Sequence, residues 1–168
     1  MQILVTLFLT VFSGLMVFPS AQALAACTDA PAAEVNWQRC YFDGQDLAGT
    51  VLTGAQLRDA TFSRGTLAGS DLSGVDAYRA KFLSADLTGV NFENARLTEA
   101  DFTKAILANA RFKDADLRRA KFFRAVLNGA DFTGAKLEDA NFLKADLSGA
   151  TWVDGQRVCA AGSVGRCN

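Results

Sequence analysis

The side chains of this sequence that could do chemistry are carboxylates and thiols, because the chain contains no histidine. Histidine is the commonest general base, metal ligand and pH switch near neutral pH. Aspartates recur at regular spacing, each directly before an apolar residue: Asp86, Asp101, Asp116, Asp131 and Asp146. Regular outward positions of this kind are typical of a solvated surface. We therefore expect no catalytic pair, no cofactor and no metal site, and predict that the protein is not an enzyme.

The four cysteines, Cys27, Cys40, Cys159 and Cys167, form two clusters near the ends of the chain. No Cys-x-x-Cys spacing is present, which disfavours a structural zinc site. An even number of cysteines in an exported chain favours disulfides.

The N-terminal segment predicts export. Residues 3–18 are almost wholly apolar, and small residues typical of a cleavage site follow up to Ala26, although no Lys or Arg precedes the apolar run. We interpret residues 1–25 as a signal peptide and expect a periplasmic or secreted bacterial protein without a transmembrane span after cleavage. The alternative is a lipoprotein, because Leu24-Ala25-Ala26-Cys27 resembles a lipobox in which Cys27 becomes the lipidated N-terminus.

The element that positions these groups is a repeat of five residues, without insertion or deletion, from Cys40 to Trp152. Five residues advance a helix by about 500°, and an odd step reverses the face of a strand, so neither element keeps the apolar centres together. The chain must turn once per repeat. Centres twenty residues apart match in type, as in Phe42 and Phe62, or Leu47 and Leu67, which indicates four repeats per coil.

The repeat units, such as Ala-Asp-Leu-Thr-Gly at 85–89 and Ala-Asp-Phe-Thr-Lys at 100–104, resemble those of the pentapeptide-repeat family. The resemblance implies an all-β fold, a right-handed quadrilateral β-solenoid with four repeats per coil and a little under six coils. Such a tube is roughly 28 Å long at ~4.8 Å per coil. Ala77 stands at a centre, and we expect Val75 to fill part of the missing volume.

The segments on either side of the solenoid at 40–152 are expected to be caps: 26–39, which includes Trp37, and 153–168. A solenoid exposes backbone groups and apolar core at both ends, so each end needs a cover. The two cysteine clusters would lie at opposite ends of the tube, too far apart to be joined. We therefore predict the disulfides Cys27–Cys40 and Cys159–Cys167, which also weigh against lipidation of Cys27.

Sorting outward residues by face gives one functional lead. Face 1 is centred on the column from Phe42 to Phe142, and faces 2, 3 and 4 on the columns that begin at Leu47, Leu52 and Leu57. Face 1 has a net charge of +4, faces 2 and 3 each have −3, and face 4 is balanced. The candidate interaction face combines cations and apolar side chains of face 1: Arg64, Lys81, Leu83, Lys104, Lys121, Phe123, Arg124, Leu143 and Lys144.

These features predict an exported, non-catalytic structural or protein-interaction module that presents flat solenoid faces. Its partner would be a protein or an anionic component of the cell envelope. The alternative function is that of a lipid-anchored envelope protein with a lipidated Cys27. The family resemblance also implies a possible role as a DNA mimic that binds topoisomerase, but mimicry of a phosphate backbone needs a strongly acidic surface. A net charge of −1 and a basic face argue against that role, and we expect no nucleic-acid partner.

Overall fold

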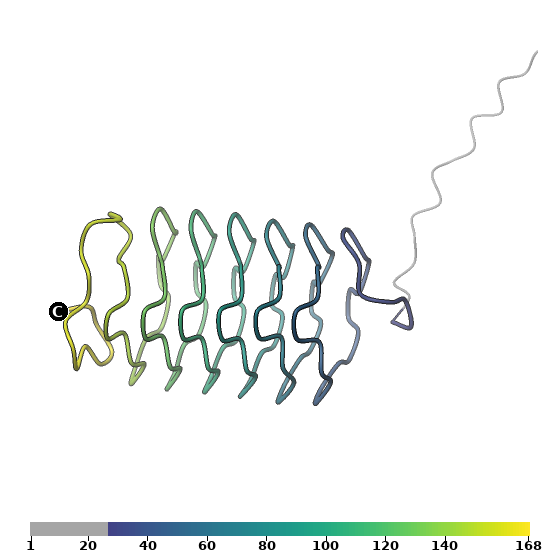
Figure 1. The fold of residues 1–168 in the computed structure, drawn as a ribbon, viewed down its shortest axis with the longest axis horizontal. Coiled ribbons are helices and arrows are strands. Elements are labelled where there is room, and N and C mark those ends of the chain that lie inside the picture. Colours follow the sequence, from purple (N-terminus) through teal and green to yellow (C-terminus); the bar gives the residue numbers. More distant parts are fainter. Residues whose placement is uncertain (1–26) are drawn as a thin grey trace, which may run out of the picture.

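The computed structural model describes residues 27–168; the predicted signal peptide at 1–25 lies outside them. The chain winds into a straight stack of coils around one axis, with the C-terminus at the far end from the purple N-terminal coil (Figure 1). The regular structure of residues 27–168 consists of isolated bridges separated by turns. Parallel bridges join residues twenty apart, from Asn36 with Gln56 to Asp131 with Thr151. The β-solenoid with four repeats per coil is thus confirmed.

Each repeat uses its backbone in the same way. In the repeat centred on Phe82, the amide of Lys81 donates to the previous coil, at 2.9 Å from the Ala60 carbonyl. The amides of Phe82 and Ser84 donate to the next coil at 2.8 and 3.0 Å. The amide of Ala85 closes the turn on the Phe82 carbonyl at 3.2 Å. The chain can turn this sharply because the residue two places after the centre has a φ of about +55° to +72° in every repeat from the centre Trp37 to the centre Leu147, as at Ser84.

The core is built from columns of like side chains. Rings of the face 1 column stack, with centroids 5.0 Å apart both from Phe82 to Phe102 and from Phe102 to Phe122. The face 3 column, which is aromatic from Phe92 onward, meets them edge-on; the rings of Phe92 and Phe102 are 5.9 Å apart. Burial of each such side chain contributes about 1.5–3 kcal/mol. Val75 and Ala77 are both buried, as expected for a centre where Val75 compensates for the small residue.

The N-terminal end differs from the predicted division at Cys40. The ladder begins one repeat earlier, because Asn36 pairs with Gln56 and the amide of Trp37 donates to the Gln56 carbonyl at 2.9 Å. Trp37 is buried and occupies the centre position above Leu57. It is therefore a member of the solenoid rather than of the predicted cap at 26–39. The predicted disulfide Cys27–Cys40, with a Cα–Cα distance of 5.4 Å, ties the preceding segment to this first coil.

The C-terminal segment turns back on the last coil. Val158 pairs antiparallel with Thr151, and Val164 pairs antiparallel with Asp146. The second predicted disulfide, Cys159–Cys167, closes this segment with a Cα–Cα distance of 4.8 Å. The two bridges of the segment lie on faces 3 and 2. The last centres of faces 4 and 1, Leu137 and Phe142, are consequently only partly buried.

Candidate functional site

The aspartates that precede the centres hold the turns. Oδ1 of Asp86 accepts the Thr88 N–H at 3.0 Å, and Oδ1 of Asp146 accepts the Ser148 N–H at 3.0 Å. This amide, one place after the centre, is the one that the backbone bonds of the repeat leave free, and Asp is suited to capture it. Hydrogen bonds from the side chains of Ser148 and Asn128 lower the pKa of Asp146. Such aspartates stabilise the local structure of the turns.

The thiols have a structural role as well. All four cysteines are in the two disulfides. Within residues 27–168, no three or more acidic or cysteine side chains gather as metal ligands would. The same part of the chain contains no helix with the length and apolar character of a membrane span.

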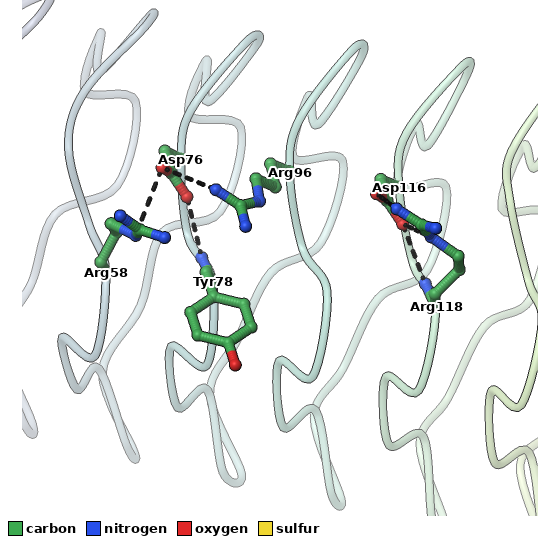
Figure 2. A network of polar contacts seen from close by, with 6 residues as sticks. All are labelled: Arg58, Asp76, Tyr78, Arg96, Asp116 and Arg118. Atoms are coloured by element: carbon green, nitrogen blue, oxygen red, sulfur yellow. Dashed lines mark hydrogen bonds and ion pairs between the residues drawn. The ribbon is translucent and has the colours of Figure 1, made fainter.

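Face 4 carries a network in which positive and negative side chains are already paired. The carboxylate of Asp76 lies 3.4 Å from the guanidinium groups of both Arg58 and Arg96, which belong to the coils on either side (Figure 2). The two guanidinium carbons lie 5.5 and 5.2 Å from the centre of the Tyr78 ring, within the range of a cation–π contact. Figure 2 shows Tyr78 between them.

Two coils after Asp76 on the same face, Asp116 and Arg118 form a bidentate ion pair. The Arg118 Nε and Nη2 atoms donate to the two carboxylate oxygens at 2.8 and 2.6 Å (Figure 2). This contact lowers the pKa of Asp116 to about 2. The five arginines of face 4 after Arg39 are thus all joined to carboxylates of the same face, whereas Lys136, Glu138 and Asp139 form no ion pair among the described residues.

Face 1 arranges its predicted interaction residues in three columns. Lys81 and Lys121 lie in the ladder column before the centres. The apolar residues follow the centres, where Leu83 and Phe123 are half-buried and Leu143 is exposed. The third column, which we call the basic ridge, lies at the edge shared with face 2 and consists of Arg64, Lys104, Arg124 and Lys144, all exposed.

The cations of face 1 differ from those of face 4 in being unpaired. Among residues 27–168, no ion pair involves the six lysines and arginines of face 1. The guanidinium of Arg124 instead lies over the ring of Phe123, 5.2 Å from its centre. The structure thus brings the predicted cations onto one surface, where none of them forms an ion pair among the described residues, although Arg64 interacts electrostatically with Asp43.

The backbone at the basic ridge is poorly suited to long side chains. Ridge residues have φ values between 57° and 61°, a left-handed conformation that costs ordinary L-residues about 1–2 kcal/mol and that Gly, Asn and Asp adopt more readily. On faces 2 and 3, the same turn position between residues 44 and 149 is held only by those three residue types: Gly49, Gly54, Gly69, Gly74, Gly89, Asn94, Asn109, Asp114, Gly129, Gly134 and Gly149. Within that range, lysine, arginine and glutamate occupy it only on faces 1 and 4. Strain retained on faces 1 and 4 is a reason to look for function at these two surfaces.

A groove of about 560 Å³ runs along the edge between faces 4 and 1. Two columns line it, one from the turns of face 4 and one from the ladder of face 1. The turn column reads Arg39, Asp59, Arg79, Glu99, Arg119 and Asp139. The ladder column reads Tyr41, Thr61, Lys81, Asp101, Lys121 and Asn141. The groove itself is bordered by the members from Tyr41 to Lys121, and we call it the corner groove.

Sequence reasoning missed the corner groove, because it sorted residues by face and the groove joins residues of two faces. Of the predicted interaction residues, only Lys81 and Lys121 line it. One signal could have found it. The turn column of face 4 alternates in sign at every coil, from Arg39 through Asp59 and Arg79 onward.

Comparison with known proteins was consistent with this geometry. The sequence profile of pentapeptide repeats matches in overlapping segments at residues 27–64, 56–94, 85–122, 95–134 and 115–151. The solved pentapeptide repeat protein Rfr23 from the cyanobacterium Cyanothece 51142 is 22% identical, with a TM-score of 0.56 over 70% of this chain and 90% of its own. Its likeness supports the right-handed solenoid fold.

Two further solved structures are more distant in shape. A pentapeptide repeat protein of the Arabidopsis thaliana thylakoid lumen is 28% identical, with a TM-score of 0.45 over 74% of this chain and 85% of its own. QnrB1, a plasmid-mediated fluoroquinolone resistance protein, is 23% identical, with a TM-score of 0.36 over 71% of this chain and 69% of its own. No curated protein gives a significant sequence match. From the profile that covers most of its described length, the chain belongs to the pentapeptide-repeat family.

Proposed function

We propose that the protein is an exported, non-catalytic binding module whose basic ridge and neighbouring apolar side chains bind an acidic protein surface. The observation that carries the proposal is the lack of ion pairs at face 1 among the described residues, in contrast to the paired charges of face 4. Phe123 and Leu143 beside Arg124 and Lys144 supply apolar contact area within the same patch. A partner with carboxylates around a small apolar centre would complement it.

Export is supported by the disulfide content. Disulfides persist in oxidising compartments such as the periplasm, and all four cysteines of the chain are bonded. The Cys27–Cys40 bond also favours a soluble protein over the lipoprotein alternative, because a lipidated Cys27 would carry a thioether on the same sulfur atom. DNA mimicry is not proposed, because the exposed ridge is basic and the net charge is only −1.

A photo-crosslinking residue at Ser84 in the native host tests the binding surface. Ser84 lies in the column of the basic ridge, between Arg64 and Lys104, and has a φ of 55°. Asn109 has nearly the same conformation, with a φ of 56°, but lies on face 2 and is a matched control position. We expect the Ser84 probe to capture a protein with an acidic surface and the Asn109 probe to capture none. Capture of phospholipid or of a cell-wall polymer alone would contradict an acidic protein partner.

Charge reversal shows whether the ridge is responsible. The variant Lys104→Glu, Arg124→Glu, Lys144→Glu should abolish the crosslink from Ser84. A control with the same change in net charge, Lys113→Glu, Lys136→Glu, Arg157→Glu, alters exposed cations outside face 1 and should retain it. Equal yields from both variants would refute the assignment.

Intact mass of the protein purified from its host tests export independently. We expect a chain that begins at Ala26 and gains four hydrogens on reduction, one pair for each disulfide. A chain that begins at an acylated Cys27 would establish the lipoprotein instead.

A further inference from the structure

The charges of the turn column alternate at every coil of the corner groove, and the three charged residues of the ladder column alternate with the same signs. A row consists of one turn residue of face 4 and the ladder residue two places later on face 1. The six rows from Arg39–Tyr41 to Asp139–Asn141 carry net charges of +1, −1, +2, −2, +2 and −1. Rows of neighbouring coils are ~4.8 Å apart, so the pattern extends over roughly 24 Å.

Contacts within the chain account for only one of the two columns. In the turn column, Arg79 lies 3.5 Å from Asp59 and Arg119 lies 3.1 Å from Glu99. In the ladder column, Lys81, Asp101 and Lys121 take part in no ion pair among residues 27–168. Lys81 and Lys121 are exposed, and Asp101 is half-buried. Their charges are available to a partner that approaches the groove.

The alternation decides which partner fits. A uniformly acidic surface would be attracted by the rows of Lys81 and Lys121 but repelled by the row of Asp101 between them. A second copy of this chain carries the same alternating rows. If the copies are antiparallel, with a two-fold axis between the third and fourth rows, the first row meets the sixth, the second meets the fifth and the third meets the fourth. Every one of these meetings joins opposite charges.

Two other registers of the same surfaces bring like charges together, and parallel copies offset by one row, although complementary, do not form a closed pair. Parallel copies in register place each row against its own sign, and an antiparallel shift by one row does the same. The even number of rows is what makes the antiparallel arrangement complementary throughout, and a two-fold axis makes each contact occur twice. Lys81 then faces Asp101 of the other copy, Arg119 faces Asp59, and Arg39 faces Asp139.

We propose that the corner groove is the interface of an antiparallel homodimer in which Lys81 of each chain pairs with Asp101 of the other. The contact rests on exposed charges, so the dimer is weak and salt-dependent. The basic ridge lies at the opposite edge of face 1 and stays exposed in both copies. The inference is thus separate from the proposed function, and reversal of the ridge charges should leave the dimer intact.

The test is sedimentation velocity of the mature protein, over a concentration series, at about 20 mM and about 500 mM ionic strength. We expect dimers at the lower ionic strength and monomers at the higher. Lys81→Glu and Asp101→Lys should each raise the dimer Kd at least about tenfold, because each places two like-charge contacts in the homodimer. An equimolar mixture of the two variants should recover the dimer. In the mixed dimer, the glutamate introduced at position 81 faces the lysine introduced at position 101, and the unchanged Asp101 faces the unchanged Lys81.

The mixture separates contacts between chains from contacts within one. Lys81 and Asp101 are also ladder neighbours in the same chain, so a variant could be weakened by a change in its own fold. Such a defect would persist in the mixture, whereas an interface defect is repaired there. A monomeric wild-type protein at low ionic strength, or a mixture that remains as monomeric as its components, would overturn the proposal.

Discussion

Replacement of the ridge residues Lys104, Arg124 and Lys144 by glycine should make the protein more stable while it removes the proposed binding surface. All three have left-handed φ values, of 60°, 57° and 61°. Glycine adopts this conformation without steric cost. Most substitutions destabilise a protein, so a gain from the loss of three long side chains would be a specific sign that the ridge is retained for a reason other than stability.

The expected gain follows from two opposing terms. The left-handed conformation costs an ordinary residue about 1–2 kcal/mol, and glycine avoids this cost. Glycine also has greater conformational entropy in the unfolded chain, which offsets about 0.5–1 kcal/mol of the gain. The net gain is about 0.5–1 kcal/mol per site, or about 1.5–3 kcal/mol for the triple variant. For a chain of this length, the melting temperature should rise by about 3–10 °C. The substitutions also remove the repulsion between the stacked cations, which adds to the gain in stability at low ionic strength. Salt screens this repulsion, so the added gain disappears at high ionic strength.

Differential scanning calorimetry at low and high ionic strength measures both the conformational and the electrostatic contribution to the change in melting temperature. Ser84→Gly is the matched control, because Ser84 has the same conformation, with a φ of 55°, but no charge. Its gain should be about 0.5–1 kcal/mol and independent of salt. A triple variant that melts at or below the wild-type temperature at both ionic strengths would show that these turns impose no cost on lysine and arginine. The strain argument for the basic ridge would then fail.

Three other expectations concern the core, the C-terminal segment and acid stability. Phe102→Ala should cost about 3–5 kcal/mol in urea denaturation, because its ring stacks at 5.0 Å on two neighbours; a loss below about 1 kcal/mol would contradict a fully packed column. Cys159→Ser with Cys167→Ser should remove about 2–3 kcal/mol of local stability and speed amide exchange of Leu147 and Gly149, which donate to this segment; unchanged exchange would show that the disulfide is dispensable. Asp116, with a folded pKa of about 2 against about 3.9 when unfolded, stabilises the protein fully above the unfolded pKa and loses this contribution as pH falls from about 4 towards 2. Asp116→Asn should therefore be less stable at neutral pH and show a shallower loss between these pH values, and an identical acid profile would refute the assignment.

Much of the fold could be predicted because every coil of the solenoid repeats the same five-residue unit. A centre every five residues and like centres every twenty define which side chains point inward and which lie on a common face. The bridge from Lys81 to Asp101 and the stacked rings of Phe82 and Phe102 follow directly from that spacing. The cysteine pairing followed from the length of the tube, which separates Cys40 from Cys159.

The structure of the two ends was less predictable, because the five-residue repeat does not extend regularly through them. Val35 and Asn36 precede Trp37 as a small residue and an Asp or Asn precede other centres, but the tryptophan replaces the usual Leu or Phe; its backbone continues the ladder and its ring fills the core. At the other end, the turn back of the chain depends on the antiparallel contacts of Val158 and Val164, which no periodicity signals. The partial exposure of Leu137 and Phe142 is a consequence of that path.

By itself, the sequence determined the coil, the columns and the net charge of each face, because in a regular solenoid these depend only on position modulo twenty. Tertiary structure alone decided which charges are neutralised. The reach of a long arginine across one coil spacing pairs Arg58 and Arg96 with Asp76, while the ridge residues form no ion pair within the described chain. It also decided that two faces meet in a groove, since a corner brings together columns that a face-by-face reading keeps apart.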